Sequence, residues 1–265
     1  MNPKTPRLLA LSRWLLRRWA RLRATLFERR KGVLVYLGMH QGREFDLIFK
    51  SYRECYGFEA NPKLFAILQD KYRDHPHVKL FNYAVAAAAG QVSFNISSNQ
   101  GASSSLGTFD EQWWNFSSGE VKIVETITVP SINLYDFCRE QGIARIDDYV
   151  SDIQGMDLEV LKTMKPYLDE RRIVSLTVET TRDGRRNIYK DLPDNSESGF
   201  RELLQDNYKL VGMGYGLLHD YWFADVPAGA WEFDCKWRRR LLPAGPRDAP
   251  LARTPAPHAG EAADK

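Results

Sequence analysis

The chain has 265 residues, of which 43% are hydrophobic and 12% aromatic, so it is long enough for one large domain with a packed core. Its net charge of +3 is uneven, because residues 1–31 hold ten Lys and Arg against the single acid Glu28. That segment therefore carries a charge of +9 and the rest −6, which argues against nucleic-acid binding by the body. The three cysteines show no metal-ligand spacing and no secretion signal is visible, so we expect a cytoplasmic location and no metal site.

The basic segment of residues 1–31 predicts an amphipathic helix. Leucine and tryptophan recur through residues 7–30 at spacings of three and four, with arginines on the other face. No apolar run reaches the ~20 residues that a membrane-spanning helix needs. Three interpretations stay open: a helix packed on the body or in a dimer, an interfacial helix on an anionic membrane with Trp14 and Trp19 at the headgroups, or an organelle-targeting peptide. The second would make the protein peripheral at the inner face of a membrane.

Strands and helices alternate through residues 32–240. Strands are expected at 33–37, 54–60, 78–85, 91–96, 122–130, 146–152 and 171–180. Helices are expected at 43–52, 61–72, 131–142, 156–168 and 196–207, with Asn61 as the cap of the second and a serine as the cap of the last.

The remaining segments complete the predicted domain. Residues 97–120 are rich in serine and glycine, which predicts a long loop, and residues 208–214 and 220–226 are expected to pair as an antiparallel hairpin. Residues 241–265 form an expected disordered tail. Alternating strands and helices imply an open, mainly parallel sheet flanked by helices. Ligands of such sheets bind beyond the carboxyl ends of the strands, where the strand order reverses.

Two strand ends carry a candidate nucleotide site. The first strand runs into GMHQG, where Gly38 and Gly42 permit a sharp turn and we expect the backbone N–H groups of residues 38–42 to face a ligand. Glu59 ends the second strand about twenty residues later, where an exposed acid can accept hydrogen bonds from ribose hydroxyls. The alternative for Glu59 is a surface residue that caps the next helix. The missing third glycine argues against a nicotinamide dinucleotide.

Seven phrases in chain order extend this pattern: VYLGMHQG, FEANP, NYAV, GQVSF, ASSSL, SINLYDF and SDIQGMDLEVLK. Across roughly residues 33–180 the chain resembles the FkbM-type family of S-adenosylmethionine-dependent methyltransferases. The resemblance implies the class I methyltransferase fold, a Rossmann-like sheet with an antiparallel last strand, and S-adenosyl-L-methionine as cofactor. The cofactor-binding residues that it implies are Tyr36, Gly38, His40, Gly42, Glu59, Asn82 and Asp152.

Several positions depart from the family pattern. Tyr36 stands where the family usually has an aspartate, and its ring and hydroxyl are expected to replace that buried acid. Ser151 and Gln154 stand in place of a lysine and a glutamate of the last phrase. Two interpretations follow: an active subfamily with a retuned site, which we favour, or a catalytically degenerate module that still binds the cofactor.

The resemblance implies O-methylation of a sugar or secondary-metabolite hydroxyl. Such a hydroxyl needs a base within hydrogen-bond reach, and Asp152 at the end of a strand is the first candidate, with His40 and Glu179 as alternatives. Asp152 could instead hold the amine of the cofactor. The loop of residues 97–120 is long enough to cover the site of a small-molecule or glycan acceptor. Its Trp113–Trp114 pair could stack on a sugar or, equally, cover the edge of the core.

Overall fold

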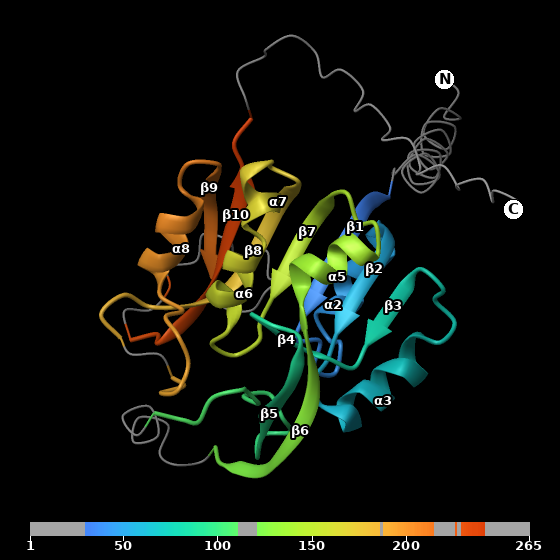
Figure 1. Cartoon of the computed structure of the whole chain (residues 1–265), viewed down its shortest axis with the longest axis vertical. Helices are drawn as coiled ribbons and strands as arrows, with labels where there is room; N and C mark the ends of the chain where they lie inside the picture. The colour runs from blue at the N-terminus through green and yellow to red at the C-terminus, as the bar shows by residue number, and fades with distance from the viewer. Residues whose placement is uncertain (1–29, 111–120, 186–187, 215–225, 227–228, 242–265) are drawn as a thin grey trace, which may run out of the picture.

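The structure, a computed structural model, describes residues 30–110, 121–185, 188–214, 226 and 229–241. Within these residues one seven-stranded sheet has the order β3-β2-β1-β7-β8-β10-β9 (Figure 1). The strands from β3 to β8 pair in parallel, and β10 is antiparallel to both β8 and β9. The strands are β1 Lys31–Leu37, β2 Tyr52–Phe58, β3 Val78–Phe81, β7 Ile146–Ser151, β8 Ile173–Thr181, β9 Tyr208–Gly214 and β10 Glu232–Arg239.

The mainly parallel sheet with its antiparallel closing pair confirms the class I methyltransferase fold. From β1 the chain first builds the sheet outward through β2 and β3, and later returns to place β7 and β8 on the other side. The strand order therefore reverses between β1 and β7. A crevice beyond the carboxyl ends of these two strands is the expected place for a ligand.

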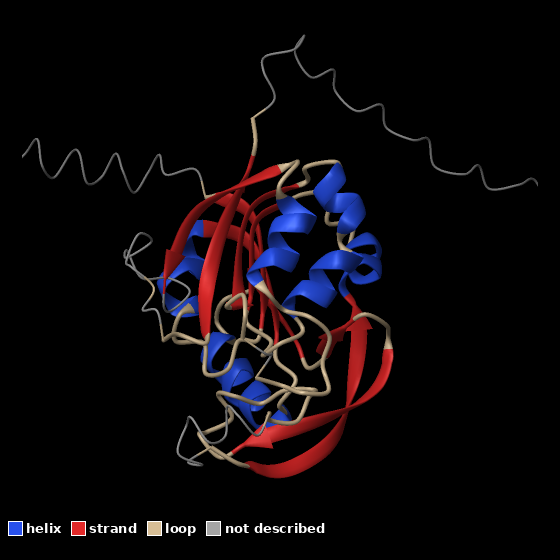
Figure 2. Cartoon of the chain, turned by 90° about the vertical axis from the view of Figure 1, so that its left-hand side faces the viewer, coloured by secondary structure: helices blue, strands red, loops and turns tan. Residues whose placement is uncertain are grey.

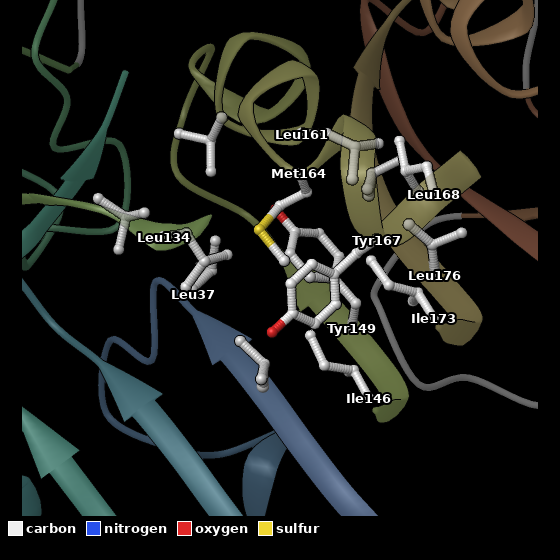
Figure 3. Close-up of a cluster of buried hydrophobic side chains, with 14 of the residues drawn as sticks. Leu37, Leu134, Ile146, Tyr149, Leu161, Met164, Tyr167, Leu168, Ile173 and Leu176 are labelled. Atoms are coloured by element: carbon white, nitrogen blue, oxygen red, sulfur yellow. The ribbon is translucent and has the colours of Figure 1, made fainter. Parts of the chain in front are cut away.

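Helices cover both faces of the sheet, and the loops gather at one end of it (Figure 2). One hydrophobic cluster joins the sheet to the C-terminal helices, with Tyr149, Tyr167 and Leu176 packed side by side (Figure 3). A second cluster joins the opposite face to the helices next to β1 and β2. The helices are α2 Phe45–Ile48, the 3-10 turn η1 Phe49–Ser51, α3 Pro62–Tyr72, α5 Leu134–Glu140, α6 Asp157–Thr163, α7 Lys165–Asp169 and α8 Glu197–Leu204.

Capping residues in the sequence correctly predicted where two helices begin. The side chain of Asn61 accepts a hydrogen bond from the Lys63 N–H at 2.9 Å, which confirms it as the cap of α3. Ser196 caps α8 in the same way, by accepting from the Gly199 N–H. A side-chain oxygen at a helix start satisfies a backbone donor that has no partner inside the helix, and this requirement is visible in the sequence.

The predicted strand at 78–85 is wrong as one element, because it is divided between two sheets. β3 ends at Phe81, and β4 belongs to a second, three-stranded sheet of order β4-β6-β5. Between them the side chain of Asn82 donates to two backbone carbonyls at the end of β2, which turns the chain. The strands of the second sheet are β4 Ala84–Ala86, β5 Gly90–Ser97 and β6 Ile123–Asn133.

Other elements also differ from their predicted bounds. The helix expected at 43–52 is limited to α2 and η1, and the one at 156–168 is divided at Met164 into α6 and α7. The predicted partner of β9 was residues 220–226, of which 220–225 lie outside the described residues, and the antiparallel partner that the structure shows is β10. β10 was missed because the alternating charges of EFDCKW, residues 232–237, resemble a surface segment.

The ends of the chain lie outside the described residues, including residues 7–29 of the N-terminal helix expected at 7–30. β1 begins at Lys31, whose Nζ forms a 2.8 Å ion pair with Asp148 of β7. Lys31 therefore belongs to the folded body and not to the basic segment. In the part of the chain that the structure describes, no helix has both the length and the apolar character needed to cross a lipid bilayer.

Candidate functional site

The turn after β1 makes contact with the end of β7. Gly38 has a φ of +76°, a conformation that glycine adopts without strain. A Cβ atom at this position would lie 1.8 Å from the backbone oxygen of Asp152. Glycine is therefore needed twice here, for the turn and for the close approach of the two strands.

The backbone donors of this turn are mostly used inside the protein. The N–H groups of Gly38 and Met39 donate to the backbone oxygen of Phe58, each at 3.1 Å, and the N–H of Gly42 donates to the backbone oxygen of Met39 at 2.7 Å. Another donates to a carboxylate oxygen of Glu59 at 2.7 Å. The expectation that the N–H groups of residues 38–42 face a ligand is therefore wrong for four of the five: those of Gly38, Met39, His40 and Gly42.

Glu59, just beyond β2, ties this turn to the next helix. Its two carboxylate oxygens accept from the N–H groups of His40, at 2.7 Å, and Asn61, at 2.8 Å. The expected exposed side chain is wrong, since Glu59 is 6% exposed. Burial raises the pKa of Glu59 to about 7, although the hydrogen bonds from Asn61 and His40 oppose the shift. The carboxyl therefore titrates near neutral pH.

The other predicted residues of this region have supporting positions. The Asn82 amide donates to the backbone oxygens of Glu59, at 2.8 Å, and Ala60, at 3.1 Å, so it fixes the backbone that carries the acid. Gly42 packs against Tyr72, whose hydroxyl oxygen would lie 2.5 Å from an added Cβ. Direct contact of Asn82 or Gly42 with a cofactor stays a prediction.

A pocket opens at the carboxyl ends of β1, β2 and β7. Its walls include Glu59 together with the apolar residues Phe58, Val85 and Phe94 from the two sheets and Leu106 from the loop after β5. Apolar walls suit a flat base, and each Glu59 oxygen keeps a lone pair for a hydroxyl donor beside its one N–H bond. These residues fit the adenosine part of S-adenosylmethionine.

The described part of the long loop lies against this pocket. Gly101, Ala102 and Ser104 belong to its lining. A ring nitrogen of His40 lies 3.0 Å from the Gln100 oxygen, which joins the loop to the turn after β1. Trp113 and Trp114, the pair expected to cover an acceptor, lie outside the described residues.

A second, more polar pocket adjoins the first. Both are lined by Gly38, His40 and Asp152, and the second adds Tyr36, Arg43 and Glu44. Tyr36 is 2% exposed, and its ring packs edge-on against Phe45 with centroids 5.5 Å apart. Its hydroxyl donates to Glu44 Oε2 at 3.3 Å. Burial, and then the charge of Glu44, raise the pKa of Tyr36, so the hydroxyl keeps its proton.

Sequence reasoning missed Glu44. It identified Tyr36 as the replacement for a buried acid but did not look for a carboxylate within reach of the new hydroxyl. Glu44 lies directly after Arg43, at the start of α2, and this adjacency was the signal available in the sequence.

A glutamine joins the two predicted carboxyls at the ends of β7 and β8. Gln154 Nε2 donates to Asp152 Oδ1 at 2.6 Å and to Glu179 Oε2 at 3.1 Å. The Tyr189 hydroxyl donates to the other atom of the same amide, Gln154 Oε1. Tyr189 is 1% exposed and therefore holds the amide with its nitrogen toward the acids. The structure thus brings Asp152 and Glu179 together, with Gln154 and Tyr189 as partners that the sequence did not reveal.

The acids at this edge are buried, and burial is the largest cause of the raised pKa of each. Burial raises the pKa of Asp152, and the Gln154 hydrogen bond partly opposes it. Burial and then the Asp152 charge raise the pKa of Glu179, and Glu232 of β10 is affected in the same way. Each of these carboxyls therefore binds its proton more tightly than an exposed acid does. Among the described residues, no three of the side chains that commonly bind metals are arranged to hold an ion.

The turn after β7 is fixed by a further buried acid. Asp157 is fully buried, and its Oδ1 accepts hydrogen bonds from the Ser151 hydroxyl and from the Ile153 N–H. Burial and the charge of Asp152 raise the pKa of Asp157 to about 7. Ser151 supports the turn that carries Asp152.

Comparison with known proteins gives a family match and several similar folds. Residues 37–205 match the model of the methyltransferase FkbM domain. No curated protein matches the chain.

Three solved structures of low identity are similar to the chain. An rRNA methylase from Streptococcus thermophilus is 10% identical and has a TM-score of 0.41, with 80% of this chain and 89% of that chain covered. The methyltransferase FkbM from Methylobacillus flagellatus KT is 12% identical and has a TM-score of 0.44. The match covers 80% of this chain and 44% of that chain, so this chain spans less than half of that protein. M. capricolum TrmK, in complex with S-adenosyl-homocysteine, is 10% identical and has a TM-score of 0.39, with 82% of this chain and 65% of that chain covered.

Proposed function

The chain belongs to the FkbM family of S-adenosylmethionine-dependent methyltransferases, and from that premise we propose that it methylates a hydroxyl oxygen of a sugar or a secondary metabolite. The observation that carries the proposal is the Asp152–Glu179 pair, bridged by the Gln154 amide, with Asp152 lining both pockets. When bound, S-adenosylmethionine supplies a methyl group attached to a positively charged sulfur.

The carboxyl pair has the properties of a base for a hydroxyl acceptor. Burial raises the pKa of both Asp152 and Glu179, and a raised pKa makes a carboxylate a stronger base for a hydroxyl proton. Asp152 would accept the hydroxyl proton as the acceptor oxygen takes the methyl group, and the cofactor would leave as the neutral thioether S-adenosylhomocysteine when its methyl–sulfur bond breaks. The hydrogen bond with Glu179 lowers the pKa of Asp152. Alignment of the acceptor can contribute a further ~7–11 kcal/mol through effective molarity. His40 is the weaker candidate, because its ring is engaged with Gln100.

A non-catalytic cofactor-binding module is the alternative, favoured by tyrosine at the position of the usual strand acid. Binding of S-adenosylhomocysteine by calorimetry and transfer of a radiolabelled methyl group to a panel of glycans and hydroxylated metabolites distinguish the two. Methyl transfer to a hydroxyl supports the proposal. Binding without transfer to any acceptor supports the module.

Asp152→Asn keeps the shape of the side chain and removes its charge. If Asp152 is the base, kcat falls by ~10²–10⁴-fold and the affinity for S-adenosylhomocysteine changes much less. Asp136→Asn, on the exposed surface of α5, is the matched control and should leave both quantities unchanged. A collapse of affinity in Asp152→Asn would instead assign the residue to holding the cofactor.

A further inference from the structure

The turn after β1 leaves few backbone donors for the amino-acid end of a cofactor. Four of its five N–H groups already donate within the protein. The pocket beside the turn must therefore recognise a charged ligand group mainly through side chains. An α-amino acid carries an ammonium and a carboxylate on the same carbon, so its recognition requires an anion and a cation placed close together.

Two adjacent residues of opposite charge line that pocket. Glu44 is half-buried and its carboxylate accepts from the buried Tyr36 hydroxyl, while Arg43 lies exposed on the rim. Tyr36 donates to Glu44 and, through its raised pKa, keeps the proton with which it does so. The Glu44 carboxylate is thereby held toward the strand end, near the place where a strand aspartate would have stood.

We propose that Glu44 binds the α-ammonium of S-adenosylmethionine and that Arg43 binds its α-carboxylate, with Tyr36 positioning Glu44. The proposal rests on the proposed function, since it concerns the same cofactor. It accounts for the loss of the strand acid at position 36, because the carboxylate is then supplied from the start of α2. It also accounts for the two adjoining pockets: the apolar one receives adenosine and the polar one the amino-acid end.

The test compares ligands that differ only at the amino-acid end. S-adenosylhomocysteine carries the ammonium and carboxylate, and 5′-methylthioadenosine lacks both. Calorimetry of Glu44→Gln should show S-adenosylhomocysteine binding weakened by roughly ten- to a hundredfold, as expected for loss of a charge-assisted hydrogen bond, and 5′-methylthioadenosine binding unchanged. Tyr36→Phe should give a smaller loss in the same direction.

Arg43→Gln provides an independent arm. This variant should bind S-adenosylhomocysteine more weakly but should bind the decarboxylated analogue of that ligand with unchanged affinity. Glu44→Gln should bind both ligands more weakly. The matched control is Asp46→Asn, which removes one negative charge from the same short helix at a residue whose partners are Lys71 and Tyr72. The control should change neither affinity.

The outcomes separate this inference from the proposed function. If wild-type protein binds neither S-adenosylhomocysteine nor 5′-methylthioadenosine, the proposed function fails. If wild-type protein binds S-adenosylhomocysteine and Glu44→Gln binds it equally well, only the assignment of Glu44 fails. Equal losses for both ligands would show that Glu44 supports the turn as a whole, which also overturns the inference.

Discussion

At the scale of single residues, we expect Glu59 to link cofactor binding to pH. Its pKa of about 7 means that the carboxyl is half protonated near neutral pH, and only the ionised form has both oxygens available to hydroxyl donors. In the free protein the raised pKa makes its contribution to stability fully present below the ordinary value of 4.5. That contribution is lost as the pH rises through about 7.

We therefore expect the affinity for S-adenosylhomocysteine to increase with pH. If the ribose hydroxyls bind the ionised form of Glu59, the dissociation constant should fall by about tenfold between pH 6 and pH 8. Glu59→Gln should bind more weakly, and its affinity should vary much less over the same range. Calorimetry at both pH values measures this, and an unchanged pH slope in the variant would contradict the role of Glu59.

Gln154 should control the pH at which the carboxyl pair becomes active. Its amide donates to both acids and lowers the pKa of Asp152. Gln154→Met removes the donor at similar side-chain length, so the pKa rises and the acidic limb of the kcat/KM profile moves to higher pH. Activity at pH 6 should fall more than activity at pH 9.

Tyr189→Phe tests the same positioning from the other side of the amide. This variant keeps the Gln154 donor and removes the hydroxyl that orients it. The acidic limb of the kcat/KM profile should therefore move to higher pH, but by less than in Gln154→Met. A uniform loss of activity in both variants, with no movement of the limb, would assign the two residues to structure alone.

At the scale of elements, the contact between the turn after β1 and the end of β7 determines the geometry of the site. Gly38→Ala would place a Cβ 1.8 Å from the Asp152 oxygen, at a φ of +76°. Crowding typically costs ~1–3 kcal/mol and the left-handed conformation a further ~1–2 kcal/mol. We expect a lower melting temperature and weaker S-adenosylhomocysteine binding. Gly229→Ala, where an added Cβ meets nothing within 4 Å, should behave like wild type in thermal denaturation.

At the scale of the whole molecule, we propose that residues 7–30 of the basic segment attach the folded body to an anionic membrane surface, where a glycolipid acceptor would be found. The support is the apolar stripe with arginines on the opposite face. Full-length protein should sediment with anionic liposomes at low salt and be released as salt rises, because screening weakens the ~1 kcal/mol that each basic residue contributes.

Deletion of residues 1–29 should abolish this sedimentation and leave S-adenosylhomocysteine binding intact. The deletion spares Lys31, whose ion pair with Asp148 and contact with Tyr52 belong to the body. Full-length protein that stays in the supernatant would contradict membrane attachment. A lower melting temperature or aggregation of the truncated protein would show that the segment packs against the body.

The sequence by itself determined the features that depend on local interactions. Periodic apolar residues located most strands and helices, and Asn61 and Ser196 showed where two helices begin. It also placed Glu59, Asp152 and Glu179 at strand ends, because the carboxyl ends of parallel strands meet at one edge of a sheet.

Only the tertiary structure decided how these residues act together. Glu232 joins the acids because β10 inserts between β8 and β9, a pairing between segments far apart in the chain. Glu59 is buried because the turn after β1 folds over it and donates to its carboxylate. Hydrogen bonds and burial between distant segments depend on which surfaces meet, and no local pattern encodes that. For this reason the sequence indicated a methyltransferase, whereas the Gln154 bridge and the Tyr36–Glu44 contact became visible only in the folded chain.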